Sequence, residues 1–172
     1  LMALGIERRS LGIAAATTWV LKDALGKVSR ILWASKFGRN FDVDAKRWRF
    51  RSSLLFALGS ALEIFTFIIP SLFLFSAAVA NALKQMSMLT SSSTRNAIYK
   101  SFARNSNNIG DITAKGEAQI AVIDLAGMCL GILISKLFNI NESRMRMVLA
   151  FIVLSSGDIF CIFNEIKSVV FN

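Results

Sequence analysis

The sequence predicts an all-α, membrane-associated bundle of about four to six helices, and two observations support that class. The hydrophobic share is 54% with a mean hydropathy of +0.54, whereas soluble domains typically contain roughly 45–50% apolar residues. Gly and Pro, which mark turns, number only 10 and 1 among 172 residues, so the helices must be long. This length fits one domain over residues 1–172, with a basic amphipathic part (1–51) and an apolar helical part (52–172).

The first third is strongly basic and is expected to form an amphipathic helix. Lys and Arg outnumber Asp and Glu by 20 to 11 over the chain. From Thr17 to Phe37, apolar residues recur at spacings of three and four. The apolar face comprises Leu21, Leu25, Val28, Ile31, Leu32 and Ser35, and the other face comprises Lys22, Asp23, Lys27, Arg30 and Lys36. Gly38 is expected to end this helix, and Asp44, closing a turn from Asn40, to cap the next.

The next helix opens with four bases interleaved with two aromatics, Lys46-Arg47-Trp48-Arg49-Phe50-Arg51. In RNA-binding proteins such a pattern places stacking rings beside phosphate contacts. Here it leads directly into an apolar run, which favours a basic, aromatic belt at the start of a membrane span over nucleic-acid binding. Lipid headgroups or an anionic partner are therefore expected to contact the belt residues Lys46, Arg47, Trp48, Arg49 and Arg51.

A Pro-interrupted apolar hairpin is expected to follow. The run Leu54 to Leu83 carries one formal charge, Glu63, and as one helix it would reach roughly 45 Å against a hydrocarbon core of about 30 Å. Pro70 interrupts it, because its ring removes an N–H group and collides with the preceding turn. Two helices are predicted, Lys46 to Ile69 and Ser71 to about Ser87. Small residues suited to close helix contact on the second are Ala77, Ala78, Asn81 and Ala82.

Polar segments are expected to separate this hairpin from the last two helices. Thr90 to Ser93 is predicted to break the helix, and Arg95 to Arg104 to resume it. The asparagine-rich segment Asn105 to Asp111 is predicted to be a loop, with Asp111 capping the helix that follows.

Two apolar runs near span length, Gln119 to Phe138 and Met147 to Phe163, predict the final helices. The short connection between them predicts an antiparallel hairpin. Gly127 and Gly131 form a GxxxG pattern that lets the backbones of apolar helices approach closely. They are expected to lie in a helix-packing face.

Glu63, Asp124 and Asp158 are lone carboxylates, each within a different apolar helix. In a bilayer such groups are costly unless they face the bundle interior and find a partner. They are expected either to pair with Arg or Lys of neighbouring helices or to line an ion or substrate path. In a soluble or peripheral bundle they would instead lie on wet faces.

The usual signatures of catalysis are missing from the sequence. It has no His, the commonest acid–base residue and a frequent metal ligand. It contains no Cys-x-x-Cys, Gly-x-Gly-x-x-Gly or Gly-x-Ser-x-Gly motif. Cys129 and Cys161 lie in apolar runs and are expected to be small buried hydrophobes. A non-enzymatic protein is expected, with no catalytic residue, metal site or cofactor identified.

Several ordered blocks resemble the root UV-B sensitive family, also described as vitamin B6 photoresponse regulators. The blocks are Trp19–Gly26, Phe41–Arg49, Pro70–Leu74, Thr94-Arg95 and Phe102–Gln119. They span most of residues 12–135. The chain departs from the family pattern at Ala24, where Gly generally follows Lys-Asp, and at Ser106, an additional polar residue. Members of this family are usually longer than the present sequence.

The resemblance implies an organelle membrane protein, often plastid-associated, that is linked in plants to seedling development, light responses, auxin transport and vitamin B6 homeostasis. It implies no established reaction. Matching residues carried over as a candidate polar site are Lys22, Asp23, Arg95, Asn108, Asp111, Lys115 and Glu117.

The expected function is a non-enzymatic integral membrane subunit or scaffold in a plastid-type organellar membrane, with a mitochondrial membrane as the other location. Its expected partners are the lipid bilayer and other membrane subunits. One alternative is a small-solute carrier that uses the intramembrane carboxylates. The other is a peripheral basic helical protein that binds anionic lipid or RNA.

Overall fold

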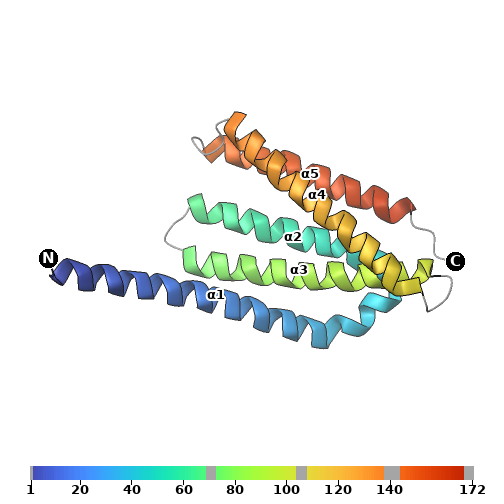
Figure 1. The fold of residues 1–172 in the computed structure, drawn as a ribbon, viewed down its shortest axis with the longest axis horizontal. Coiled ribbons are helices and arrows are strands. Elements are labelled where there is room, and N and C mark those ends of the chain that lie inside the picture. Colours follow the sequence, from blue (N-terminus) through green and yellow to red (C-terminus); the bar gives the residue numbers. More distant parts are fainter. Residues whose placement is uncertain (1, 69–72, 104–107, 138–143, 169–172) are drawn as a thin grey trace.

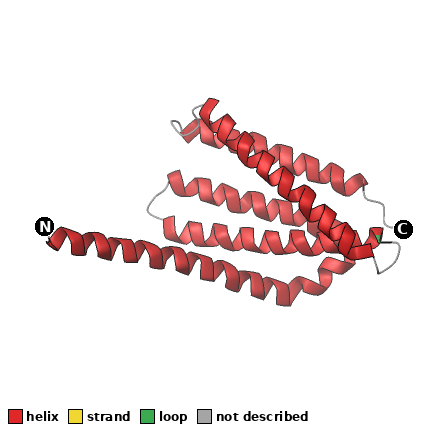
Figure 2. Cartoon of the chain, in the orientation of Figure 1, coloured by secondary structure: helices red, strands yellow, loops and turns green. Residues whose placement is uncertain are grey.

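The computed structural model describes residues 2–68, 73–103, 108–137 and 144–168. Within these ranges the protein is all-helical, as predicted (Figures 1 and 2). The five helices are α1 (Met2–Val43), α2 (Ala45–Ile68), α3 (Phe73–Phe102), α4 (Ile109–Leu137) and α5 (Arg144–Ser168).

Helices α2 and α3 form the centre of the molecule as an antiparallel pair (Figure 1). Helix α1 packs along α3, α5 contacts α2, and α4 contacts α3 near the start of α4. The predicted apolar hairpin is therefore confirmed, although Pro70 and the residues beside it lie outside the described ranges. The arrangement leaves α4 and α5 as an outer layer above the three-helix core.

Helix α1 does not end at Gly38 but continues to Val43. No atom lies within 4 Å of a Cβ placed on Gly38, and the aromatic rings on either side of it pack on Trp48, with centroid distances of 5.3 Å from Phe37 and 5.2 Å from Phe41. This packing favours helical backbone across the glycine, so the expected turn from Asn40 is wrong. Asp44 alone separates α1 from α2, and its backbone N–H donates to Asn40 O at 3.2 Å.

Helix α3 is likewise longer than predicted, because the expected break at Thr90–Ser93 does not occur. The hydroxyl groups in this segment donate to carbonyls one turn earlier, Thr90 to Met86 at 2.8 Å and Ser92 to Leu89 at 3.0 Å. Thr90 also accepts a hydrogen bond from Trp33 Nε1 at 3.0 Å. These hydroxyls are satisfied inside a continuous helix, where polar composition alone had predicted a linker.

The core is built from small and hydroxyl-bearing residues. Besides glycines, the buried residues in the described ranges are Phe41, Ala45, Trp48, Ala77, Ala80 and Ile98, with Ser52, Ser53, Thr66, Ser76, Ser87, Thr90 and Thr94. The largest side chains with less than 2% exposure are threonines, Thr90 and Thr94. Small residues let helices approach closely, as at Gly59, where an added Cβ would lie 3.0 Å from Ala80 O.

Large apolar side chains lie outside this core. The leucines, isoleucine and valine of the predicted apolar face of α1 are 46% to 67% exposed. The same helix approaches α3 through buried Gly26, beside Asn81, whose Nδ2 donates to Lys22 O at 3.0 Å. The amphipathic helix is present, but its apolar face points away from the bundle.

Two described helices are long and apolar enough to cross a membrane, α4 over Ile109–Leu137 and α5 over Met145–Ser168. None of the most apolar stretch of either helix is buried. The two helices run in opposite directions, as the predicted hairpin requires (Figure 1). Within the described residues, however, they do not pack closely on each other. Each helix instead forms an ion pair with the central pair of helices. Glu117 of α4 pairs with Arg95 of α3, and Glu165 of α5 pairs with Arg49 of α2.

Cys129 and Cys161 are exposed on these outer helices. The expectation that both are buried is therefore wrong. Apolar neighbours such as Met128, Leu130 and Phe160 are exposed as well.

Candidate functional site

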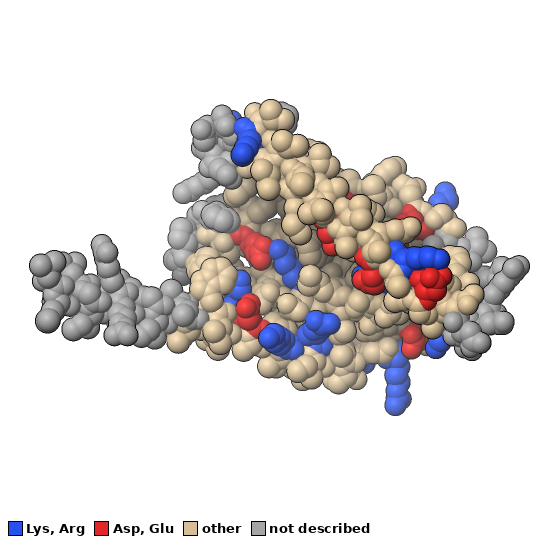
Figure 3. All heavy atoms as spheres, viewed as in Figure 1, with Lys and Arg blue, Asp and Glu red and all other residues tan. Residues whose placement is uncertain are grey.

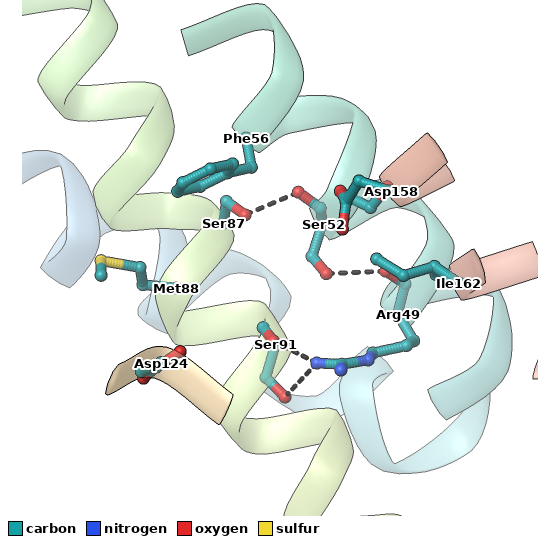
Figure 4. Close-up of a pocket in the computed structure, with 10 residues that line it drawn as sticks. Arg49, Ser52, Phe56, Ser87, Met88, Ser91, Asp124, Asp158 and Ile162 are labelled. Atoms are coloured by element: carbon teal, nitrogen blue, oxygen red, sulfur yellow. Dashed lines mark hydrogen bonds between the residues drawn. The ribbon is translucent and has the colours of Figure 1, made fainter. Parts of the chain in front are cut away.

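A polar pocket of about 400 Å³ lies among α2, α3, α4 and α5 (Figure 4). Its lining residues are Arg49, Ser52, Ser53, Phe56, Ser87, Met88, Ser91, Asp124, Asp158 and Ile162. The volume falls within the range of roughly 300–1,000 Å³ that is usual for small-molecule sites. The charged and hydroxyl-bearing lining contrasts with the apolar outer faces of α4 and α5.

Arg49 extends from the first turns of α2 toward α3 (Figure 4). Its Nη1 donates to the Ser91 hydroxyl oxygen and lies 3.4 Å from Ser91 O. Its Nη2 lies 3.6 Å from Glu165 Oε1 on α5. The side chain is 18% exposed. Through these contacts, Arg49 of α2 links α2 to both α3 and α5.

Serines from α2 and α3 form the floor of the pocket. The Ser87 hydroxyl donates to Ser52 O at 2.6 Å across the helix pair, and the Ser52 hydroxyl donates to Arg49 O at 2.7 Å. Ser53 is 4% exposed. Its hydroxyl has no hydrogen-bond partner in the part of the chain that the structure describes.

The outer helices contribute one carboxylate each, Asp124 from α4 and Asp158 from α5. Figure 4 displays them on opposite sides of the serines. Across the described ranges, neither carboxylate has an ion-pair or hydrogen-bond partner. The residues described also contain no group of three or more His, Cys, Asp or Glu that could hold a metal ion.

Glu63, the third lone carboxylate, is separate from this pocket. It forms a close ion pair with Lys84 of α3, whose ammonium lies 5.5 Å from the Phe56 ring centroid. Within the described ranges, the expected pairing with a neighbouring base is therefore present for Glu63 and for neither aspartate. A substrate path lined by the other two carboxylates, Asp124 and Asp158, stays a prediction.

The residues of the candidate polar site fall into two separate groups. Asp23 lies beside Lys22 at Asn81, with Asp23 Oδ1 3.5 Å from Asn81 Nδ2. The other residues lie where α3 ends and α4 begins. Arg95 Nη1 lies 3.2 Å from Glu117 Oε1, Lys115 Nζ lies 2.8 Å from Asp111 Oδ2, and Asn108 is exposed just before α4. Asn81 and Arg95 are separated along α3 by roughly 21 Å at about 1.5 Å per residue, so the two groups do not form one site.

The predicted belt is divided between surface and interior. Trp48 is 7% exposed, since it packs among Trp33, Phe37 and Phe41, and Arg49 faces the polar pocket. Trp48 still meets one other belt residue, because the Arg51 guanidinium lies 4.9 Å from the centroid of its ring. Lys46, Arg47 and Arg51 instead line a second, largely apolar pocket of about 560 Å³. Its remaining lining residues are Phe50, Phe163, Ile166 and Lys167.

Gly127 and Gly131 have no atom within 4 Å of an added Cβ. The described part of the chain therefore leaves the GxxxG face uncovered. Contact between this face and another protein stays a prediction.

Sequence reasoning missed the serines of the polar pocket. Ser52 and Ser53 interrupt an otherwise apolar run, and Ser87 and Ser91 stand four residues apart, on one face of a helix. Hydroxyls at helical spacing inside apolar segments were the available signal. Their meeting depends on the antiparallel register of α2 and α3, which no local pattern specifies.

The fold and the pocket define an all-helical protein with small polar residues inside, span-length apolar helices outside and a charged pocket between them. A family model described as the vitamin B6 photo-protection and homoeostasis domain matches residues 1–172. The chain belongs to the root UV-B sensitive family, as the resemblance had indicated.

Named relatives in Arabidopsis thaliana cover nearly all of this chain. "Protein root UVB sensitive 6" is 43% identical over 99% of the chain and 33% of the relative. "Protein root UVB sensitive 4" is 36% identical over 97% and 32%, and "Protein root UVB sensitive 2, chloroplastic" is 32% identical over 92% and 36%. The chain thus spans about a third of the length of these relatives. No solved structure matches it.

Proposed function

We propose that this chain forms the helical part of an organellar membrane protein that acts without catalysis, as a subunit or scaffold of a membrane assembly. The observation that carries the proposal is the inverted placement of side chains. Threonine, serine and alanine fill much of the core, while apolar residues such as Ile123 (68% exposed) and Val153 (69% exposed) lie outside. In water, a large contiguous apolar surface marks a protein or membrane contact. In lipid, small interior residues are the normal means of helix packing.

The largely apolar pocket between α2 and α5 supports lipid as one partner. Four bases, Lys46, Arg47, Arg51 and Lys167, surround its apolar wall. Long basic side chains can place their stems along apolar surface while their charged ends meet anionic headgroups. This arrangement favours lipid over RNA, because RNA recognition usually uses exposed rings for base stacking, whereas Trp48 is buried.

The uncovered GxxxG face supports a second partner, another membrane helix. Gly127 and Gly131 are open on α4, and an apolar helix with this pattern can bring a partner backbone into close contact. The proposed location is a plastid membrane. The name of one relative, "Protein root UVB sensitive 2, chloroplastic", supports that location.

Replacing both glycines by leucine tests the assembly. Gly127→Leu with Gly131→Leu is expected to reduce the mass of the complex purified in mild detergent, because side chains would fill the helix contact. Light scattering coupled to size-exclusion chromatography measures that mass. Neither glycine has a neighbour within 4 Å in the described chain, so internal folding should survive, which circular dichroism checks.

Gly157→Leu provides the matched control on α5. Gly157 is equally open but has no second glycine four residues away. The assembly should keep its mass in this variant. An unchanged mass in the Gly127/Gly131 double variant would rule out the proposed packing face.

A further inference from the structure

The polar pocket carries negative charge that the described chain leaves unneutralised. Among the described residues that line it, Arg49 is the one base, and its two terminal nitrogens are already directed to Ser91 and Glu165. Its Nε is buried and has no hydrogen-bond partner in the described structure. Asp124 and Asp158 therefore face the pocket without a compensating base.

A second feature of the pocket also points to a missing ligand. The Ser53 hydroxyl is buried and lines the pocket, yet it has no hydrogen-bond partner among the described residues. Buried polar groups are normally satisfied, and an unsatisfied one calls for an explanation. A ligand with hydrogen-bonding groups in the pocket would supply the missing partner.

We propose that the polar pocket binds a small organic cation through one or more ammonium groups. Asp124 and Asp158 would accept charge-assisted N–H bonds, and serine hydroxyls would accept others. An anionic ligand fits less well, because Arg49 is engaged and two carboxylates would repel it. A metal ion also fits less well, since two carboxylates in a pocket of about 400 Å³ leave most of the volume unfilled.

Calorimetry on the purified 172-residue chain in phosphatidylcholine nanodiscs tests this inference. The probes are 1,4-diaminobutane, the neutral 1,4-butanediol and the dianion succinate. Binding of the diamine, with no binding of the diol or succinate, is the expected result. Succinate binding, or equal binding of diamine and diol, would overturn the proposal without any variant being needed.

Neutralising the carboxylates then locates the site. Asp124→Asn and Asp158→Asn should each lower diamine affinity at least about tenfold, the loss of one hydrogen bond to a charged group. Both side chains lack partners in the described structure, so folding should be unaffected. Asp42→Asn, at an exposed position of α1 outside the pocket lining, is the control and should bind normally. Equal affinity in all three variants would exclude this pocket.

A free amine and a lipid headgroup could both supply the ammonium group. Adding phosphatidylethanolamine to the nanodiscs separates these sources. Competition with the diamine would assign the pocket to the headgroup, and its absence to a free amine; either outcome supports a cation site. The inference stands apart from the membrane-subunit proposal, because ligand affinity and assembly mass are separate measurements.

Discussion

Buried serine side chains can raise or lower the stability of this protein, depending on whether their hydroxyl groups form hydrogen bonds. Ser87 lies across the α2–α3 contact and donates to Ser52 O at 2.6 Å. Ser53, equally buried in the same pocket, has no partner in the described structure. A buried hydroxyl without a hydrogen bond costs free energy, whereas a satisfied one contributes about 1 kcal/mol.

Ser53→Ala is therefore expected to raise the free energy of unfolding of the unliganded protein, by up to about 1 kcal/mol. Ser87→Ala is expected to lower it by a similar amount, because the Ser52 carbonyl loses its inter-helix donor. Denaturant titration in detergent, followed by circular dichroism, measures both changes. Destabilisation of both variants to the same degree would mean that the Ser53 hydroxyl has a partner.

At the residue scale, the sequence identified unusual charged residues better than it identified the residues that contact them. Glu63, Asp124 and Asp158 stand out in any sequence reading, since each is a charge within an apolar run. That Glu63 has Lys84 while the two aspartates line a pocket depends on contacts between separate helices. Arg49 was assigned to a surface belt, because linear pattern does not distinguish adjacent inward and outward positions.

At the element scale, helix packing rather than composition determines where helices end. Gly38 and the Thr90–Ser93 segment both predicted helix boundaries, and both lie inside helices. The apolar runs at Gln119 and Met147 did predict α4 and α5, because their length and periodicity suffice without tertiary context. The hairpin of α2 and α3 was predictable for the same reason, with Pro70 as the interruption.

Replacement by alanine should have opposite effects on stability at Gly38 of α1 and Gly59 of α2. Gly59→Ala places a Cβ 3.0 Å from Ala80 O, a backbone atom that cannot move freely, so the α2–α3 contact must open. We expect destabilisation of about 1–3 kcal/mol. Gly38→Ala meets no atom within 4 Å and should stabilise α1 by roughly 0.5–1 kcal/mol through helix propensity. Thermal unfolding monitored by circular dichroism compares them, and stabilisation by Gly59→Ala would contradict the close approach.

At the scale of the whole molecule, charge and apolar surface occupy different regions. The described ends of α1, α3 and α5 and the starts of α2 and α4 gather at one end of the molecule (Figure 1). In Figure 3, uncharged residues cover much of the outer helices, while charged side chains lie toward that end and also along the middle of the molecule. Such segregation suits a bilayer, where polar ends meet headgroups and apolar lengths meet hydrocarbon. Composition predicted this class, but not that the large side chains would lie outside the core.

The two cysteines provide a test of where these outer surfaces lie. Cys129 and Cys161 are exposed on the protein itself, so any protection from a water-soluble maleimide in membranes must come from lipid or a partner. Thiolate is the reactive form, and it does not persist in hydrocarbon. We expect both cysteines to remain unlabelled in opened native membranes and to be labelled fully after denaturation in dodecyl sulfate.

An added cysteine, Ala114→Cys, lies at an exposed position in the early turns of α4 and should be labelled before denaturation. Labelling of Cys129 as fast as Ala114→Cys would place α4 in water, and the inverted side-chain distribution would then require a protein partner covering both outer helices.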